Sequence, residues 1–227
     1  SFIEGYCIEN NINVNTNYDI ADGVLKAYTG SETNLTIPSN LCITTIGTEA
    51  FYNCKWLKTV SIGVDTCGNN DGVIGESAFE GCERLHNVPL GEGIAEIGYK
   101  AFFGCYDIVK YIHIPDSVTT IAQGAFGNCR IIELKLGKGV SSIDVIPIPF
   151  YNNPYRYVVD SQNPFFSNDE YTALFNKDKT TLIHYPSFNE NKKYTIPATV
   201  TSIGEEAFRT SALTSVLIPE EVTAIGD

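Results

Sequence analysis

Cysteine is the residue type in this chain that is best suited to metal or redox chemistry, and the sequence contains seven of them. Zinc sites usually take their cysteines in close pairs, and most of these cysteines are widely spaced, which disfavours zinc. Four recur at steps of 28, 23 and 24 residues: Cys54, Cys82, Cys105 and Cys129. We predict that these four thiols are free and buried, filling space and donating weakly to turn carbonyls. Two of the other three, Cys7, Cys42 and Cys67, could form a disulfide bond.

Catalytic motifs are missing from the sequence. It lacks the Gly-x-Ser-x-Gly, His-Glu-x-x-His and P-loop motifs. A catalytic set of a nucleophile, a histidine and an acid is recognised by its geometry in space, which the sequence does not give for the histidines His86, His113 and His184. The segment 91–96 resembles half of a dinucleotide-binding loop but lacks the third glycine. Because no set of reactive residues converges, we predict that the chain is not an enzyme and holds no metal or cofactor.

The charge balance narrows the classes of partner. The 227 residues include 27 acidic and 15 basic side chains, so the formal net charge is −12. Such a chain repels phosphate backbones, which disfavours nucleic acid. No apolar run approaches the roughly 20 residues of a membrane span, so we expect no membrane insertion. The loop 65–72 could hold a calcium ion, but its spacing fails the EF-hand pattern, and a plain turn is favoured.

A repeated unit determines how the chain must position its side chains. The pattern Ile-Gly-x-x-Ala-Phe at 46–51 returns, with small variations, further along the chain. The steps between its Ile positions are 28, 23, 24, 22, 60 and 22 residues, so one long step hides an interruption. A Cys often follows the Phe by three residues, and a Leu-x-x-Val-x-Ile pattern comes next, as at 57–62. The later copies begin at Ile74, Ile97, Ile121 and Ile203, with weaker ones at Ile143 and Ile225.

Each part of this unit has a physical role. The alternation in 60–62 places two side chains inward and one outward, as in a strand. Proline often follows, as at Pro115 and Pro219, and ends the strand because it has no amide donor. The Ala-Phe pair suits a short helical turn. One coil cannot bury its apolar face alone, so we expect stacked coils with parallel strands about 4.8 Å apart.

The full unit, Leu-x-x-Val-x-Ile-Pro-x-x-Val-x-x-Ile-Gly-x-x-Ala-Phe-x-x-Cys, resembles the BspA-like (Treponema pallidum type) leucine-rich repeat. Residues 213–226 match its first half, residues 108–129 match nearly all of it, and the resemblance covers most of 34–227. It implies an α/β repeat fold, a single right-handed leucine-rich-repeat solenoid with parallel strands, short helical turns and one inserted β-hairpin coil. It also implies a bacterial surface protein that adheres to host matrix proteins or other cells, although the family also occurs in parasitic protists.

The two ends of the chain depart from the repeat. Residues 1–33 lack the pattern, and we predict that they cap a solenoid spanning 34–227, since an open stack needs a polar end. The chain opens at Ser1 without a targeting segment and stops at Asp227 within a repeat. We expect either that a targeting peptide has been removed or that the sequence is part of a longer protein.

Residues 144–193 interrupt the period. Strands are expected at 157–160, 171–175 and 181–185, with a hairpin turn at 176–179. We interpret the segment as a longer coil with a projecting β-hairpin, because fifty residues would form a marginal core of their own.

The outward side chains of the strands are the main candidate for function. In a leucine-rich solenoid they line the concave face, which such proteins use for binding. Their mixture of aromatic, histidine and opposite charges would suit a modest protein-binding strip, whereas the alternative is a solvated sheet face without a partner. The predicted surface consists of Thr59, Ser61, Asn87, Tyr111, His113, Glu133, Lys135 and Ser215. A rival surface is the insert with its aromatic residues Tyr155, Tyr157, Phe165, Phe166 and Tyr171.

Two functions therefore remain open. The first is a cell-surface or secreted interaction module that adheres to a protein or glycoprotein of a host or neighbouring cell. The second is a structural spacer within a longer surface protein. A spacer tolerates polar substitutions on the outward strand positions, whereas an adhesin loses binding when Tyr111, His113, Glu133 and Lys135 are changed together.

Overall fold

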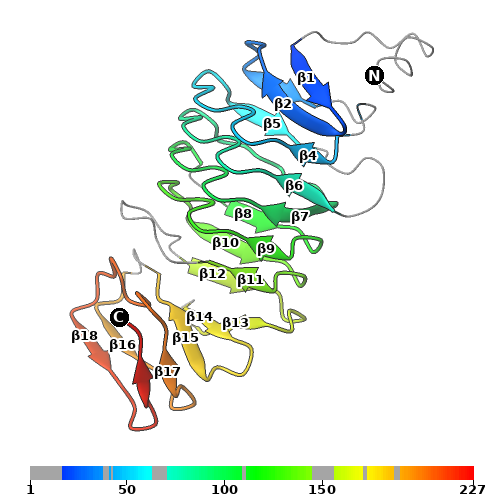
Figure 1. Cartoon of the computed structure of the whole chain (residues 1–227). Helices are drawn as coiled ribbons and strands as arrows, with labels where there is room; N and C mark the ends of the chain where they lie inside the picture. Colours follow the sequence, from blue (N-terminus) through cyan, green and yellow to red (C-terminus); the bar gives the residue numbers. More distant parts are fainter. Residues whose placement is uncertain are drawn as a thin grey trace.

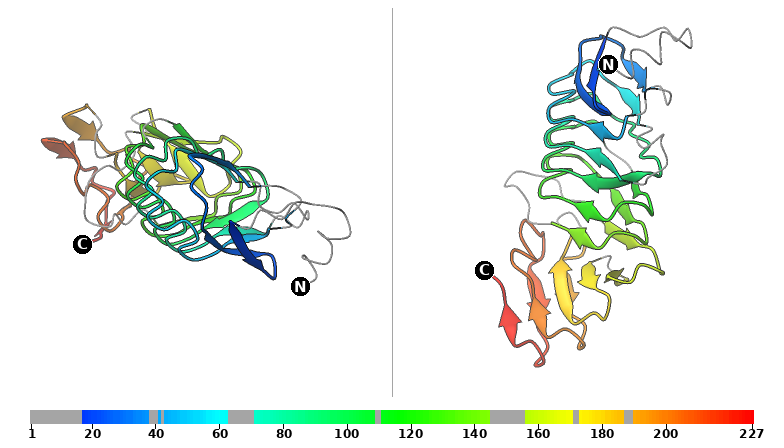
Figure 2. Two further views of the ribbon diagram at one scale, coloured as in Figure 1. Left: turned by 90° about the horizontal axis from the view of Figure 1, so that it is seen from above. Right: turned by 45° about the vertical axis from the view of Figure 1, so that its right-hand side comes forward.

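The chain winds into an elongated solenoid in which each coil lies against the next (Figure 1). The computed structural model describes residues 17–37, 41, 43–62, 71–108, 111–144, 156–170, 173–186 and 190–227. Seen from above, the coils from β2 to β12 superimpose into a flattened ring, and the last strands lie to one side of it (Figure 2). The predicted stack of coils with parallel strands is confirmed.

One side of the solenoid, which we call the Ile-Gly side, carries the strands that precede the Ile-Gly pattern. Its first part is a seven-stranded sheet in which β1 pairs antiparallel with β2 and all later pairs are parallel. The strands are β1 (Tyr18–Ala21), β2 (Val24–Tyr28), β4 (Thr45–Ile46), β6 (Gly72–Ile74), β7 (Ile94–Ile97), β9 (Thr120–Ile121) and β11 (Ser142–Ile143). The predicted boundary between cap and solenoid at 33/34 stays a prediction, although β2 already pairs with β4 ahead of it.

The other side, which we call the Val side, carries the strands of the Leu-x-x-Val-x-Ile pattern. They form three separate parallel groups, β3–β5, β8–β10–β12 and β16–β18. Their bounds are β3 (Asn34–Thr36), β5 (Thr59–Ser61), β8 (Tyr111–Ile114), β10 (Glu133–Leu136), β12 (Arg156–Val159), β16 (Lys193–Thr195) and β18 (Ser215–Leu217). Inward and outward positions alternate as the sequence predicts, with Ile112 buried between exposed Tyr111 and His113.

The Ala-Phe segments form tight turns, so the predicted short helical turns are wrong. The first turn contains two residues with left-handed backbone, Glu49 and Asn53, at φ angles of 58° and 56°. Such residues break a helix and turn alternate amides toward the neighbouring coil. Phe51 and Asn53 accordingly donate to the carbonyls of Ala78 and Glu80 in the next coil, both at 2.8 Å. In the part of the chain that the structure describes, no α-helix is present.

The interior of the stack is organised around a ladder of phenylalanine rings from these turns. The centroids of Phe51 and Phe79 are 4.7 Å apart, those of Phe79 and Phe102 are 5.1 Å apart, and those of Phe102 and Phe126 are 5.3 Å apart. The first three rings are fully buried. Because these distances match the spacing of paired strands, each ring covers the ring of the coil before it.

The insert is built into the solenoid. The expectation that its β-hairpin projects from the stack is therefore wrong. The hairpin itself is present, since β14 (Leu174–Asn176) pairs antiparallel with β15 (Thr181–His184). On one side β14 pairs with β13 (Phe166–Asn168), and on the other β15 pairs in parallel with β17 (Ser202–Ile203). β17 then pairs with β19 (Ala224–Ile225), so these strands continue the Ile-Gly side.

Two hydrophobic clusters meet at the insert. The first extends from Leu25 to Leu174, and the second from Ala173 to Ala207. Tyr157 on β12 belongs to the first cluster, and His184 on β15 precedes Tyr185 of the second. Both are nearly fully buried, and the Tyr157 hydroxyl lies 3.0 Å from Nδ1 of His184. Nearby, the fully buried Asn163 donates to the carbonyls of Gly137 and Val140, each at 2.9 Å. Polar pairs of this kind fix how the two parts of the stack fit together.

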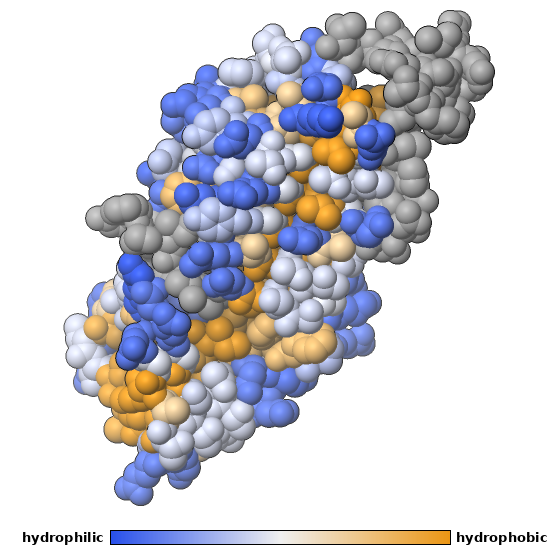
Figure 3. All heavy atoms as spheres, viewed as in Figure 1, coloured by the Kyte–Doolittle hydropathy of each residue, from blue (hydrophilic) through white to orange (hydrophobic). Residues whose placement is uncertain are grey.

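Apolar surface gathers over the last strands, β17 to β19, as Figure 3 shows. Ile218 and Ile225 are 47% and 62% exposed. Their counterparts in inner coils, Ile114 and Ile203, are 0% and 4% exposed because another coil covers them.

Candidate functional site

The Val side brings most of the predicted partner surface together. Strand register places Tyr111 beside Glu133 and His113 beside Lys135, and an isolated bridge places Thr59 beside Asn87. Ser61 lies on the same strand as Thr59. Ser215 is separate, because it lies on β18 in the last two-stranded group.

A pocket opens where the sheet of the Val side is interrupted. Segment 87–90 makes two isolated bridges to the preceding coil, and within the described ranges no ladder joins it to β8. Pro89 has no amide donor, which explains why regular pairing stops here. The pocket has a volume of about 310 Å³. It is lined by Asn87, Val88, Pro89, Leu90, Glu92, Tyr111, His113 and Pro115.

The lining combines an aromatic ring, a histidine and a carboxylate with apolar side chains and two prolines. Tyr111 is the most prominent group, with 64% of its surface exposed. Of the eight residues predicted for the partner surface, the pocket takes in Asn87, Tyr111 and His113. The contributions of Val88, Leu90 and Pro115 were not expected from the sequence, because the interruption that opens the pocket depends on how two coils stack.

Charged pairs flank the pocket on the following coils. Glu133 forms an ion pair with Arg156, and Asp116 forms one with Lys138 at 2.7 Å. The hydrogen bond from Lys138 holds the pKa of Asp116 below its ordinary value and raises that of Lys138. The Asp116–Lys138 pair is exposed on both sides, so it contributes little to stability, whereas Glu133 is partly covered beside the exposed Arg156. Both pairs set the charge pattern that a ligand meets.

Arg156 is a residue of this surface that the sequence analysis missed. It was assigned to the insert, whereas the register of β10 and β12 places it beside Glu133 and places Val158 beside Lys135. The run of aromatic and β-branched residues at 157–159 is the sequence signal that marks this stretch as a strand.

The rival surface at the insert is mostly interior. Tyr157 and Phe166 are 2% and 9% exposed, whereas Phe165 is 48% exposed. Tyr155 and Tyr171 lie outside the described residues, as do Cys7, Cys42, Cys67 and most of the loop predicted at 65–72.

The four regularly spaced cysteines form a second ladder beside the phenylalanines. All are buried and free. The last three donate through Sγ to a phenylalanine carbonyl of the preceding coil: Cys82 to Phe51 at 3.1 Å, Cys105 to Phe79 at 3.2 Å and Cys129 to Phe102 at 3.1 Å. Burial raises the pKa of Cys54 to about 11 and that of Cys82 and Cys129 to about 12. Such thiols are held as neutral, unreactive groups at neutral pH.

The ladder predicts a specific pattern of thiol reactivity. In a variant with Cys7, Cys42 and Cys67 replaced by serine, we expect no reaction with Ellman's reagent in the folded state at pH 7.5, because the remaining thiols are protonated and covered. Unfolding in guanidinium should release four reactive thiols. Rapid labelling of any of the four in the folded protein, at a rate close to that of free cysteine, would contradict the buried ladder.

Among the described residues, no group of three or more His, Cys, Asp or Glu side chains is arranged to share a metal ion. No helix in those residues has the length and hydrophobicity needed to cross a bilayer.

Known proteins share both the repeat and the fold. The sequence profile described as the BspA type leucine-rich repeat region matches in six copies, over residues 18–153 and 159–227. No curated protein sequence gives a significant match.

Three solved structures illustrate the structural similarity. The pneumococcal vaccine antigen PcpA is 19% identical over 89% of this chain and 59% of its own, with a TM-score of 0.60. A leucine-rich cell surface protein from Faecalibacterium prausnitzii A2-165 is 24% identical over 94% and 72%, with a TM-score of 0.58. The T. pallidum leucine-rich repeat protein is 20% identical over 92% and 82%, with a TM-score of 0.51. The chain spans only 50% to 59% of the length of several such relatives.

Proposed function

Because the chain belongs to the family of BspA-type leucine-rich repeat proteins, we propose that it is a non-enzymatic binding module of a cell-surface or secreted protein. Its partner is a protein or glycoprotein on a host or neighbouring cell, and its role is adhesion. In support, one relative of the same fold is named as a cell surface protein and another as a vaccine antigen.

The observation that carries this proposal is the pocket on the Val side. A spacer needs only a continuous stack, whereas here the sheet is interrupted at Pro89 and opens a pocket of about 310 Å³. Beside this pocket stands Tyr111, a half-exposed ring on a rigid strand. Tyrosine is among the residues that contribute most to protein interfaces, because a large rigid ring is buried at little cost in entropy.

The surroundings of the pocket suit a protein ligand. The ion pairs Glu133–Arg156 and Asp116–Lys138 place charges of both signs beside the pocket, since Glu133 lies next to Tyr111 and Asp116 follows Pro115. A partner side chain enters the pocket, and its neighbours meet these charges. Specificity then comes from the match of charges, and affinity from burial of Tyr111.

Substitution at the pocket tests the proposal directly. We expect the double variant Tyr111→Ala, His113→Ala to weaken binding to an immobilised panel of matrix proteins, mucins and whole cells by at least about tenfold. Surface plasmon resonance at physiological salt measures this. The matched control is Ser215→Ala, an outward position of the same side on a separate group of strands, and it should bind as the unmodified protein does.

The other outcomes separate the alternatives. Binding that survives the double variant places the partner elsewhere on the solenoid. Complete lack of binding to every member of the panel supports the spacer and contradicts the adhesion module.

A further inference from the structure

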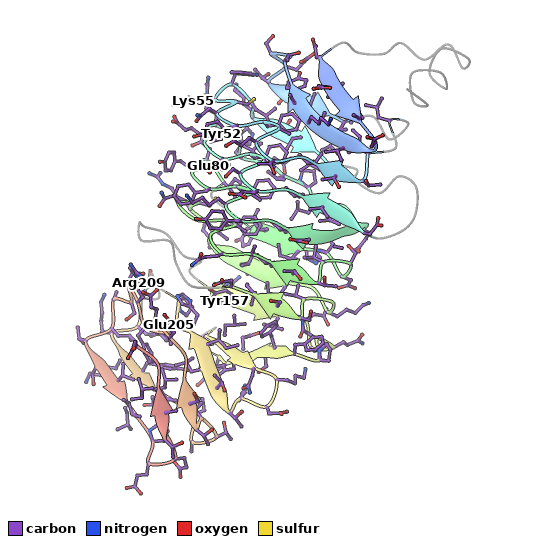
Figure 4. All side chains as sticks on the ribbon, in the orientation of Figure 1. Tyr52, Lys55, Glu80, Tyr157, Glu205 and Arg209 are labelled. Atoms are coloured by element: carbon purple, nitrogen blue, oxygen red, sulfur yellow. The ribbon has the colours of Figure 1, made fainter. Side chains whose placement is uncertain are left out.

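A group of exposed aromatic side chains occupies the turn edge of the solenoid, where the chain passes from the Ile-Gly side to the Val side. Tyr52 is 47% exposed, Trp56 39%, Tyr99 38% and Tyr106 44%. We call these four residues the aromatic patch. Figure 4 shows Tyr52 with Lys55 and Glu80 on this edge. The patch is distinct from the pocket of the Val side, which is lined by residues within and after the strands.

The turns that carry the patch stack in register. Asn53 donates to the carbonyl of Glu80 in the next coil, and Gly81 donates to the carbonyl of Phe103 in the coil after that, both at 2.8 Å. Tyr52, Glu80 and the half-buried Phe103 therefore occupy equivalent positions in three successive coils. Lys55, Glu83 and Tyr106 form a second such row, and Lys55 contacts Glu83 at 2.7 Å.

A third row consists of Trp56, Arg84 and Asp107. Together the rows give the patch an order of aromatic coil, mainly acidic coil and aromatic coil. The buried ring ladder directly beneath it advances by 4.7 Å and 5.1 Å over these coils. Two coil steps thus separate the aromatic groups at the two ends. An extended β-1,4-linked sugar chain advances by close to one such step per sugar, so a disaccharide unit spans the acidic coil.

The composition of the patch favours a sugar over an apolar ligand. Within described residues 43–62 and 71–108, every exposed large hydrophobic side chain is aromatic, and three of the four carry a hydroxyl group. A half-exposed ring presents an apolar face on which the C–H face of a sugar can stack, and its polar group stays in water. Carboxylates such as Glu80 and Glu83 accept hydrogen bonds from sugar hydroxyls.

We propose that the aromatic patch binds a neutral β-1,4-linked glycan, which lies along the solenoid axis across the coil of Glu80 and Glu83. Trp56 and Tyr52 stack on the sugars at one end, and Tyr106 stacks on the sugars at the other end. The glycan is neutral because the net charge of −12 disfavours sulfated or carboxylated sugars. This site is independent of the protein-binding pocket proposed above.

The single tryptophan of the chain provides a reporter at the site. Titration with the hexasaccharides of β-1,4-linked N-acetylglucosamine, glucose and xylose should give a saturable change in Trp56 fluorescence with at least one of them. Isothermal titration calorimetry should give the same dissociation constant. The α-1,4-linked hexasaccharide of glucose should not bind, because its chain curves away from the straight edge.

Substitutions in the aromatic patch test whether the glycan binds there. Trp56→Ala with Tyr106→Ala should weaken binding at least tenfold by calorimetry, and Trp56→Phe, which keeps a ring, should weaken it less. Tyr111→Ala removes an exposed ring outside the patch and should bind glycan as before. The proposal is overturned if none of the three β-1,4-linked hexasaccharides binds at millimolar concentration, or if the double variant binds as tightly as the unmodified protein. If substitutions at Tyr111 abolish binding of the protein partner, the glycan result does not change, because Tyr111 lies outside the aromatic patch.

Discussion

Replacing Phe79 with alanine is expected to lower the free energy of unfolding by about 3–5 kcal/mol. Phe79 is fully buried, and its ring is stacked between those of Phe51 and Phe102 at 4.7 Å and 5.1 Å. Truncation removes the contacts on both faces and leaves a cavity in the middle of the stack. Turns on either side are joined by backbone hydrogen bonds and by the thiols of Cys82 and Cys105, so the cavity cannot close without breaking coil-to-coil hydrogen bonds.

The effect is measured by guanidinium denaturation followed by far-ultraviolet circular dichroism. The matched control is Tyr52→Ala, a ring in a turn of the neighbouring coil that is 47% exposed, for which we expect a change within about 0.5 kcal/mol. Phe79→Leu, which keeps most of the volume, should fall between the two. Equal stability of Phe79→Ala and Tyr52→Ala would show that the ring ladder does not hold the coils together.

The repeat made most of the fold predictable, because each coil encodes its own inward and outward positions locally. Val60, Ile112 and Leu134 are buried, and their neighbours point outward, as the alternation requires. The same pattern predicted the parallel register, since like residues stack on like.

The helical turn was wrong for a reason visible in the sequence. Ala50 and Phe51 are compatible with a helix, and we gave weight to them alone. The residue before each ladder cysteine is asparagine or glycine in the regular coils: Asn53, Gly81, Gly104 and Asn128. All four have positive φ, which these residue types adopt most readily, so this position was the signal for a left-handed turn.

The parts that could not be predicted depend on contacts between distant segments. The sequence shows Pro89 but not the pocket, because the pocket opens only where the neighbouring coil fails to pair with this segment. The aromatic patch was missed because Tyr52 and Tyr106 look unremarkable in two separate repeats, and only the stack brings their coils within two steps. At the insert, β12 could be recognised as a strand, but not its place beside β10 or the contact of Tyr157 with His184.

The contact between Tyr157 and His184 is expected to make the stability of the protein depend strongly on pH. Burial lowers the pKa of His184 to about 4, from an ordinary value of 6.5. The imidazole is therefore neutral in the folded state, with Nδ1 3.0 Å from the hydroxyl of Tyr157, whose pKa burial raises. In the unfolded chain the same imidazole takes up a proton below about pH 6.5.

The direction of the change in stability with pH follows from whether the folded or the unfolded state binds more protons. Between pH 6.5 and pH 4 the unfolded state is protonated at His184 and the folded state is not, so stability falls as the pH falls. The shift is equivalent to about 3 kcal/mol, present in full above pH 6.5 and lost by about pH 4. Because the two hydrophobic clusters meet at this pair, the loss acts on the joint between them.

Comparison with His184→Gln isolates this contribution. Carboxylates titrate in both proteins and cancel in the difference between their stability curves, measured by urea denaturation from pH 7.5 to pH 4. Glutamine offers Tyr157 a polar partner but takes up no proton, so the difference in stability should change by about 3 kcal/mol across the window, in favour of the variant at low pH. The control His86→Gln removes an exposed histidine and should leave the curve parallel to that of the unmodified protein. If the His184→Gln curve is also parallel, the imidazole is not held neutral and the joint between the clusters is open to water in the folded state.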